Sequence, residues 1–197
     1  MRIEQFVMAY NVEQDRLRAM LPEGFSSLRP VLRFNGEIRG GKLGYLELNT
    51  PVEGFGKRGW LNIARWNGKV NAVSFVREER KVTFYNPFAE ITFAPVGIRG
   101  GCPAEKDNDG CFYPSCGQYA FLPAEKITEN KEFCDCSFRF LFPGGAFGVS
   151  EGKTLPAFYE EPETAYEKQP FTFETAGLIP CRTVLGAYTV AFERDVE

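Results

Sequence analysis

Apolar and polar residues alternate over several short stretches of the chain, which is the pattern of β-strands with one buried face. Residues 31–39 show it clearly, because Leu32, Phe34 and Ile38 fall on one face and polar or charged residues on the other. Turns rich in glycine separate similar stretches, and this spacing predicts a meandering antiparallel sheet or barrel. We expect further strands at residues 4–10, 45–50, 60–66, 70–76, 82–85, 90–93, 134–142, 171–175 and 182–192.

One helix is predicted near the start of the chain, over residues 12–21. Asn11 has the residue type of an N-cap, and Gln14 three residues later completes a capping-box pattern. Pro22 then ends the helix, because proline cannot continue the backbone hydrogen bonding. With few helices among many strands, the predicted fold class is α+β and predominantly antiparallel β.

Residues 100–117 interrupt the strand pattern, because they are rich in Gly, Pro, Asn, Asp and Cys. A segment of this kind within a compact domain is typical of a long functional loop. Residues 151–170 are polar and contain prolines, so we expect them at the surface. Neither segment has the composition of an interdomain linker, and the sequence predicts a single domain over residues 1–197.

Composition narrows the chemistry, because the 197 residues include no histidine. Ser-His-Asp catalysis, Cys-His catalysis and histidine metal sites are therefore excluded. The formal net charge is -3 and no long basic run occurs, so we expect no nucleic-acid partner. No signal peptide is apparent and no stretch approaches the ~18 apolar residues of a membrane span. We expect a cytoplasmic protein without a membrane partner.

The cysteines favour reduced thiols, because nothing in the sequence indicates export. No CxxC pair is present, so a metal site is not expected. Neither a GxGxxG nor a Walker motif occurs, and no cofactor is expected. The six cysteines are Cys102, Cys111, Cys116, Cys134, Cys136 and Cys181.

The opening of the chain carries an ordered series of short motifs. A strand ending in Tyr10 leads into a short helix, which ends in Leu21, Pro22 and Glu23, and residues 30–34, 44–47 and 60–63 follow. In its order and spacing this series resembles the acetoacetate decarboxylase superfamily, over roughly the first third of the chain. The resemblance implies a β-rich barrel or cone with few helices and a pocket inside.

The family chemistry uses a lysine that forms a Schiff base with a keto group. In the family this lysine belongs to a Lys-Lys pair that follows an Arg-Glu and a proline. Here Arg77 and Glu78 resemble the Arg-Glu, but neither the proline nor the Lys-Lys pair follows. Lys81 is near the expected position, although a register shift would be needed. Lys81 and Lys57 are the candidates for a relocated lysine.

The resemblance also implies acidic pocket residues. Glu47 corresponds to an active-site glutamate of the family, and Asn35 stands where the family has a second one. Glu37 shares a strand face with Asn35 and is a further acid/base candidate. An outer polar face is the alternative for both glutamates. Substrate-binding candidates are Asn35, Arg58, Arg77 and Trp60.

Three functions remain open at this point. The first is a divergent enzyme, a possible lyase, acting on a small oxo acid or related carbonyl compound without the family lysine. The second is a non-catalytic binding protein for such a compound, and the third is a decarboxylase with a relocated lysine. The expected partner is a small-molecule ligand, and assembly into a homo-oligomer is left open.

Overall fold

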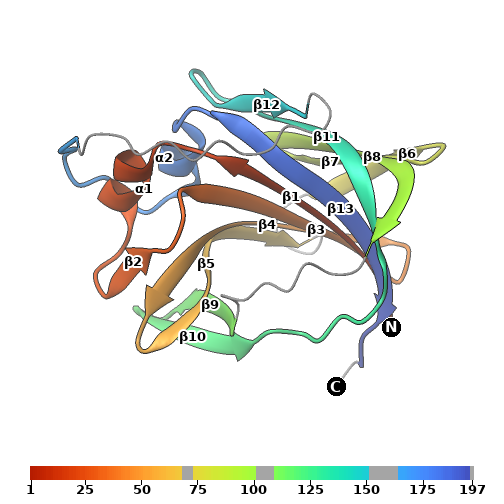
Figure 1. Ribbon diagram of the computed structural model, residues 1–197, viewed down its shortest axis with the longest axis horizontal. Helices are drawn as coiled ribbons and strands as arrows, with labels where there is room; N and C mark the ends of the chain where they lie inside the picture. Colours follow the sequence, from red (N-terminus) through yellow and green to blue (C-terminus); the bar gives the residue numbers. More distant parts are fainter. Residues whose placement is uncertain (68–72, 101–108, 151–163, 196–197) are drawn as a thin grey trace.

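Thirteen strands form one curved sheet in the computed structural model, which describes residues 1–67, 73–100, 109–150 and 164–195 (Figure 1). The strands are β1 (Arg2–Asn11), β2 (Phe25–Ser27), β3 (Val31–Arg39), β4 (Leu43–Gly54), β5 (Lys57–Asn67), β6 (Ser74–Glu78), β7 (Lys81–Asn86), β8 (Ala89–Gly100), β9 (Gly110–Ser115), β10 (Gln118–Pro123), β11 (Lys131–Phe140), β12 (Phe147–Val149) and β13 (Thr183–Glu193). The main path runs β10-β9-β5-β4-β3-β1-β13-β11-β8-β7-β6, with β12 beside β11 and β2 beside β4.

The predicted dominance of antiparallel strands is confirmed. Among the described strands only β5 and β9 pair in parallel. The sheet is not closed, however, because its path ends at β10 on one side and at β6 on the other. The predicted barrel or cone is thus confirmed as a curved, open sheet, and its curvature is visible in Figure 1.

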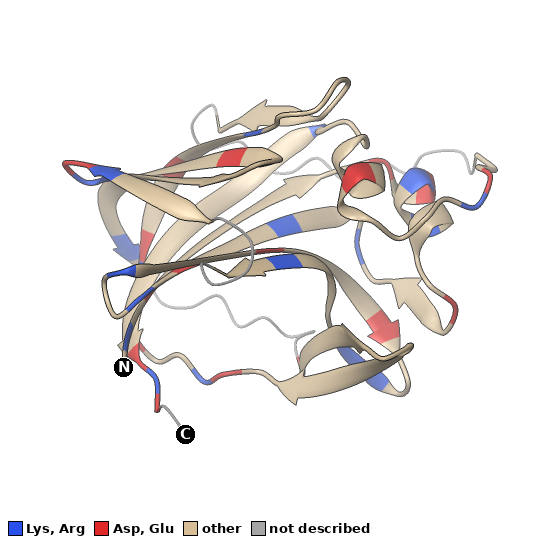
Figure 2. Cartoon of the chain, turned by 180° about the vertical axis from the view of Figure 1, so that it is seen from behind, with Lys and Arg blue, Asp and Glu red and all other residues tan. Residues whose placement is uncertain are grey.

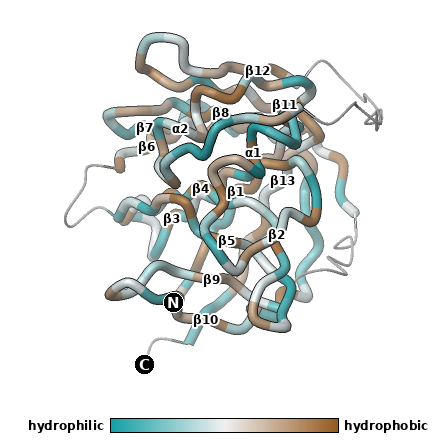
Figure 3. The backbone as a smooth tube through the Cα atoms, turned by 90° about the vertical axis from the view of Figure 1, so that its left-hand side faces the viewer, coloured by the Kyte–Doolittle hydropathy of each residue, from teal (hydrophilic) through white to brown (hydrophobic). Residues whose placement is uncertain are grey.

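Alternation along β3 separates two buried faces. Leu32, Phe34 and Ile38 are fully buried and belong to the main apolar core, as the alternation predicts. The intervening residues Arg33 and Glu37 are also buried, although they are charged. Figure 3 shows that hydrophilic and hydrophobic positions are mixed along the chain. A buried polar face is unlike an ordinary solvated face, and it indicates a lined cavity.

Close packing in the core requires a glycine at one position of β3. The Phe84 ring, on β7, lies over Gly36 so closely that an added Cβ would stand 3.0 Å from it. Phe84 is fully buried and also packs edge-on against Phe6, with ring centroids 5.4 Å apart. Gly36 thus lets β7 approach the central strands across the core.

Two helices lie beside the sheet, α1 (Gln14–Met20) and α2 (Phe173–Gly177). The first confirms the predicted helix, but Asn11 is not its N-cap. Asn11 ends β1, and the capping position is occupied by Glu13, which makes no side-chain capping bond. The strand continues one residue beyond Tyr10, and the helix therefore begins at Gln14, two residues later than predicted.

The strand predicted at residues 171–175 is wrong, because Phe173 begins α2. The Thr172 hydroxyl accepts a hydrogen bond from the backbone N–H of Thr175 at 3.1 Å and caps this helix. Phe173 packs edge-on against Trp66 with ring centroids 4.6 Å apart. Phe171 and Phe173 alternate with polar residues, which is the pattern of a strand. The hydrogen bond of the Thr172 side chain instead stabilises the start of a helix.

The loop predicted over residues 100–117 is corrected where the structure describes it. Residues 101–108, including Cys102, lie outside the described residues. The rest of the segment forms most of a hairpin, in which β9 pairs antiparallel with β10 and parallel with β5. Phe112 is buried against Leu61 and Val52 in a second apolar cluster. The hairpin is thereby fixed beside β5 by strand pairing and by apolar packing.

No helix in the described parts of the chain is long and apolar enough to cross a membrane. The first and last strands, β1 and β13, are antiparallel neighbours in the middle of the sheet. Both ends of the described chain lie together in Figure 1. All described strands thus belong to one sheet, and the single domain over residues 1–197 stays a prediction.

Candidate functional site

The polar faces of β3, β4 and β5 place three side chains in one row across the sheet. Asn35 lies opposite Glu47, and Glu47 lies opposite Arg65 in the antiparallel register. Directly opposed residues point to the same face of a sheet and lie close together. This row therefore puts an amide, a carboxylate and a guanidinium side by side on the concave face.

Glu47 is the centre of the site, with only 2% of its surface exposed. Its Oε1 accepts hydrogen bonds from the Asn35 and Asn49 amides at 2.9 and 3.0 Å. Its Oε2 accepts from the Tyr45 and Tyr113 hydroxyls at 2.6 and 3.2 Å. A carboxylate offers about four acceptor positions, and four neutral donors use them here. The side chain is thus held in one orientation.

A β-bulge extends this network along β4. The pairing of β4 with β5 shifts between Leu48 and Asn49, which places Asn49 opposite Asn62. The Asn62 amide donates to Asn49 Oδ1 at 3.0 Å and to the Ala64 carbonyl at 3.1 Å. Asn49 and Asn62 are both buried. The second asparagine therefore fixes the first, which in turn orients Glu47.

The two tyrosines are permanent donors to this carboxylate. Burial raises the pKa of Tyr45 above its ordinary value, and the charge of Glu47 raises it further. The same two causes, burial first, raise the pKa of Tyr113. Both hydroxyls therefore keep their protons at neutral pH. Their oxygens remain able to accept a hydrogen bond from a bound molecule.

A second carboxylate, Glu37, lies one row further along β3 and is 3% exposed. The Arg39 Nε donates to its Oε2 at 2.7 Å, and Arg194 binds both of its oxygens at 2.8 and 3.0 Å. Burial raises the pKa of Glu37, but the hydrogen bonds and charges of Arg194 and Arg39 outweigh burial and hold the pKa below 4.5. Arg194 also pairs with Glu125 at 2.7 Å.

These groups line one cavity of about 980 Å³. Its walls come from the polar face of the central strands, from β9, from the segment after β10 and from Arg194 near the end of the chain. Figure 2 marks the charged residues along these elements. The lining residues are Gln5, Val7, Arg33, Asn35, Glu37, Arg39, Tyr45, Glu47, Arg65, Asn67, Cys111, Tyr113, Leu122, Pro123, Ala124, Glu125, Lys126, Ile127, Thr128, Lys131, Tyr188 and Arg194.

Several cations of this cavity stack on aromatic rings. Arg33 lies 3.6 Å from the centroid of Trp60, and Arg39 lies 4.0 Å from that of Tyr45. The Lys131 ammonium lies 3.8 Å from the centre of the Tyr188 ring. A cation is attracted to the face of an aromatic ring, and the contact restricts its side chain. The cationic groups are therefore pre-positioned.

The structure brings the predicted residues Glu47, Glu37 and Asn35 together in this cavity. The alternative of an outer polar face is wrong for both glutamates, since both are buried. Trp60 is buried behind the lining and supports Arg33.

Other predicted residues lie elsewhere. Arg58 is exposed and pairs with Glu53 at 3.2 Å, and Arg77 pairs with Glu4 at 2.8 Å. Neither arginine lines the cavity. The ammonium of Lys57 lies 4.1 Å from the centre of the Phe121 ring, also outside the cavity lining.

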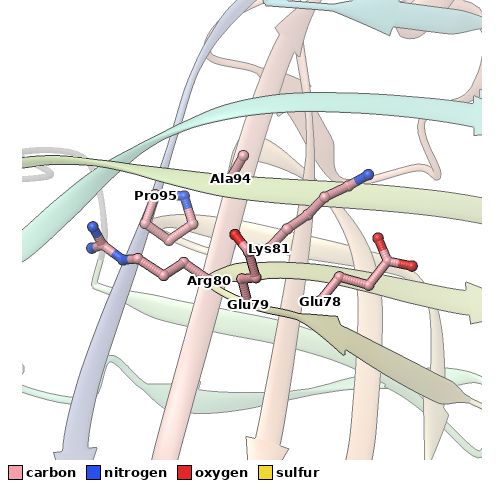
Figure 4. Close-up of a pocket in the computed structure, with 6 residues that line it drawn as sticks. All are labelled: Glu78, Glu79, Arg80, Lys81, Ala94 and Pro95. Atoms are coloured by element: carbon pink, nitrogen blue, oxygen red, sulfur yellow. The ribbon is translucent and has the colours of Figure 1, made fainter.

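Lys81 is the first residue of β7, and five strands separate β7 from β4, which carries Glu47, along the sheet path. It borders a shallow hollow of about 460 Å³ with Glu78, Glu79 and Arg80. Figure 4 shows its side chain extended away from that of Arg80. The lining of this hollow shares no residue with the lining of the Glu47 cavity. The structure therefore does not bring Lys81 together with Glu37, Glu47 and Asn35.

Sequence reasoning missed Tyr113, Arg65, Lys131 and Arg194. Tyr113 lies in the glycine- and cysteine-rich segment, where no local pattern indicates a strand beside β5. Arg65 had a detectable signal, because it is a charged residue between Ala64 and Trp66, which both pack in the main core. The roles of Lys131 and Arg194 depend on contacts between distant segments, which a single sequence does not reveal.

The described residues contain no group of three or more Cys, Asp or Glu side chains arranged to hold a metal ion. Burial raises the pKa of Cys134 and of Cys136 to about 12, and that of Cys181 to about 11. These thiols stay protonated at neutral pH, which makes them poor nucleophiles.

Comparison with known proteins gives matches of structure. No family model matches the chain, and no curated protein matches it. The acetoacetate decarboxylase from Legionella pneumophila aligns with a TM-score of 0.51 and 14% identity over 97% of this chain and 81% of that one. Another acetoacetate decarboxylase structure aligns with a TM-score of 0.53 and 15% identity, over 96% of this chain and 83% of that one. The enduracididine biosynthesis enzyme MppR complexed with pyruvate aligns with a TM-score of 0.50 and 10% identity, over 96% of this chain and 84% of that one.

Proposed function

The chain has an acetoacetate decarboxylase-like fold, and we propose on this premise that it binds a small oxo acid or related carbonyl compound in the Glu47 cavity. The buried Glu47, held by four neutral donors among cationic groups, is the observation that carries the proposal. The similar fold of MppR, which was solved with pyruvate, supports a 2-oxo acid as the ligand type. Fold alone does not define a ligand, so the chemistry of the cavity has the greater weight.

Each part of an oxo acid has a suitable partner in the cavity. A carboxylate suits a guanidinium such as that of Arg65, which offers paired N–H donors. A hydroxyl of the hydrated or enol form suits Asn35 Oδ1, a buried oxygen that accepts no hydrogen bond among the described residues. The Tyr45 and Tyr113 oxygens are further acceptors. Polar groups left buried without a partner are costly, which favours a ligand that satisfies them.

Acid/base chemistry on the bound compound is assigned to the two buried glutamates, without a Schiff base. Glu47 accepts hydrogen bonds from the tyrosine hydroxyls and so fixes the position of their oxygens, and Glu37 holds Arg39 and Arg194 one row further along the cavity face. A proton could leave or reach the ligand through either group. Under this proposal the protein is a divergent lyase-like enzyme, and a pure binding protein is the alternative.

The test is calorimetric titration with pyruvate and other small oxo acids, together with a turnover assay. Glu47→Gln turns one acceptor oxygen into a donor that faces existing donors, so binding should weaken at least about tenfold. Glu53→Gln is the matched control, because Glu53 is exposed and pairs with Arg58. Equal affinity of both variants and the native protein would overturn the proposal. Binding without turnover would assign the protein to the pure binders.

Lys131 favours a second candidate function, a decarboxylase with a relocated lysine. It is 3% exposed and lines the cavity, unlike Lys81 and Lys57. In this reaction the lysine amine would add to the ligand's carbonyl carbon, and loss of water would give an iminium. With a 3-oxo acid, the bonding electrons released on loss of carbon dioxide would move into the iminium to give an enamine, and protonation of its carbon and hydrolysis would then release the ketone and the lysine amine.

Borohydride trapping, measured by intact-protein mass, separates the two candidates. Reduction of an iminium fixes the ligand on the lysine and adds a defined mass. An adduct mapped to Lys131 and absent in Lys131→Met would establish the lysine mechanism. Oxo-acid binding without any adduct would exclude it for those compounds and leave the glutamate chemistry.

A cytoplasmic location and a single domain over residues 1–197 belong to the same proposal. The five cysteines among the described residues are all free thiols, which supports a reducing compartment. A small-molecule ligand is the proposed partner, and a homo-oligomer stays an open alternative.

A further inference from the structure

The Glu47 cavity is rich in positive charge, although the whole chain has a formal net charge of -3. Among its described lining residues, six side chains are cationic and three are acidic. A cavity of one sign concentrates ligands of the opposite sign. The cationic residues are Arg33, Arg39, Arg65, Lys126, Lys131 and Arg194, and the acidic ones are Glu37, Glu47 and Glu125.

The three carboxylates are already used by particular partners. Glu37 binds Arg39 and Arg194, and Glu125 binds Arg194. Glu47 accepts hydrogen bonds from four neutral side chains within the described part of the chain. Glu37 and Glu125 therefore neutralise Arg39 and Arg194, at one side of the cavity.

Two cations have no carboxylate partner among the described residues, Arg65 and Lys126. Arg65 lies on β5 in the row with Glu47, and its guanidinium is 5.0 Å from the centre of the Tyr113 ring. Lys126 belongs to a different wall, the segment that follows β10. Both are exposed, so water solvates them until a ligand arrives. They are two separate positive positions on two walls of one cavity.

We propose that the ligand is a dicarboxylate oxo acid, with one carboxylate bound by Arg65 and the other by Lys126. The planar guanidinium of Arg65 suits a two-point contact with a carboxylate, while the Lys126 ammonium acts as a point charge. The inference rests on the proposed function and deepens it, because it defines the ligand class of the same cavity. It requires selection for the number of charges on the ligand, in addition to selection for the carbonyl.

Four five-carbon acids separate charge from carbonyl chemistry. They are 2-oxoglutarate (two carboxylates and a keto group), glutarate (two carboxylates only), 2-oxopentanoate (one carboxylate and a keto group) and pentanoate (one carboxylate only). Affinities are measured by calorimetric titration at pH 7 and constant ionic strength. We expect 2-oxoglutarate to bind at least about tenfold more tightly than 2-oxopentanoate.

Two variants test whether Arg65 and Lys126 are the groups that bind the two carboxylates. Arg65→Gln and Lys126→Gln should each reduce the preference for 2-oxoglutarate over 2-oxopentanoate about tenfold, towards equal affinity. Arg139→Gln is the matched control, since Arg139 is exposed, pairs with Glu90 and does not line the cavity. It removes the same charge from the protein and should leave the preference unchanged.

The outcomes distinguish this inference from the proposed function. Equal binding of both keto acids, with both above pentanoate, would overturn the dicarboxylate inference and retain the proposed function. Equal binding of glutarate and 2-oxoglutarate, with both above the monoacids, would retain charge selection and overturn the carbonyl requirement. A preference that survives in both cavity variants, or falls equally in Arg139→Gln, would overturn the assignment to Arg65 and Lys126.

Discussion

The hydroxyl of Tyr113 on β9 donates a hydrogen bond to Glu47 on β4, although 66 positions separate the two residues in sequence. The strands β9 and β4 are not paired directly, since β5 lies between them. The bond therefore crosses the cavity side of the sheet and joins the hairpin to the central strands. It links the position of the hairpin to the orientation of the carboxylate.

Tyr113→Phe should weaken ligand binding about three- to tenfold and lower the unfolding free energy by about 0.5–1.5 kcal/mol, the usual range for one hydrogen bond. The ring and its stacking with Arg65 are kept, so only the hydroxyl is lost, both as a donor to Glu47 and as an acceptor for the ligand. Titration and thermal unfolding measure the two effects. Tyr119→Phe, on the same hairpin, is the control because its ring contacts Phe25 outside the cavity. Identical results for the two variants would contradict the role of Tyr113.

Acid should destabilise the protein partly through Glu37. Its pKa in the folded protein lies below the ordinary 4.5, so Glu37 stabilises the fold above pH 4.5, and this contribution is lost as the pH falls through the folded pKa. Glu37→Gln should therefore be less stable than the native protein at pH 7, with a smaller loss of stability on acidification. Urea unfolding between pH 3 and 7 measures this slope.

The control for the pH experiment is Glu90→Gln, whose carboxylate pairs with the exposed Arg139. Exposed ion pairs contribute about 0–1 kcal/mol, so this variant should keep nearly the native slope. A Glu37→Gln slope equal to the native one would show that the carboxylate is not coupled to Arg39 and Arg194 in solution.

Gly36→Ala should destabilise the protein by about 1–3 kcal/mol, because the new methyl group overpacks the core against Phe84. In a protein of this size each kcal/mol lowers the melting temperature by about 2–4 °C. The double variant Gly36→Ala/Phe84→Leu tests the cause, since the smaller side chain gives the methyl group room. The two changes should then cost less together than the sum of their separate effects. Strict additivity would mean that another contact limits this position.

Thiol labelling should separate one cysteine from the buried group. Cys116 is exposed, whereas burial raises the pKa of Cys134 and Cys136 to about 12. At pH 8, iodoacetamide should modify Cys116 in the folded protein and reach the other two only in denaturant. Peptide mass mapping over time gives the rates. Comparable rates at all three positions in the native protein would disagree with the packing of β11.

The sequence predicted the central strands because their faces differ in polarity at every second residue. It also indicated Glu47 through the short pattern that it shares with a known family. The partners of Glu47 were harder, since Asn49 needs a β-bulge and Tyr113 needs a parallel pairing between distant segments. Neither leaves a periodic signal.

The error at Phe173 has a similar physical origin. Phe171 and Phe173 alternate with polar residues and so satisfy the strand pattern, yet a single threonine side chain can cap a short helix. Lys81 follows the Arg-Glu pair that resembles the family motif, but it lies on β7, and the sheet order places β7 far from β3 and β4 along the path. Distance along a motif does not specify which face or edge of a curved sheet a side chain occupies.

Strand β3 also bears on how such a protein can change over evolutionary time. Its odd-numbered residues Arg33, Asn35 and Glu37 line the cavity, while its even-numbered residues belong to the core side. Substitutions at odd positions can therefore alter ligand choice while leaving core packing intact. The two faces of this strand can thus change independently, one for ligand binding and the other for core packing. New ligand specificities can therefore arise while the fold is kept.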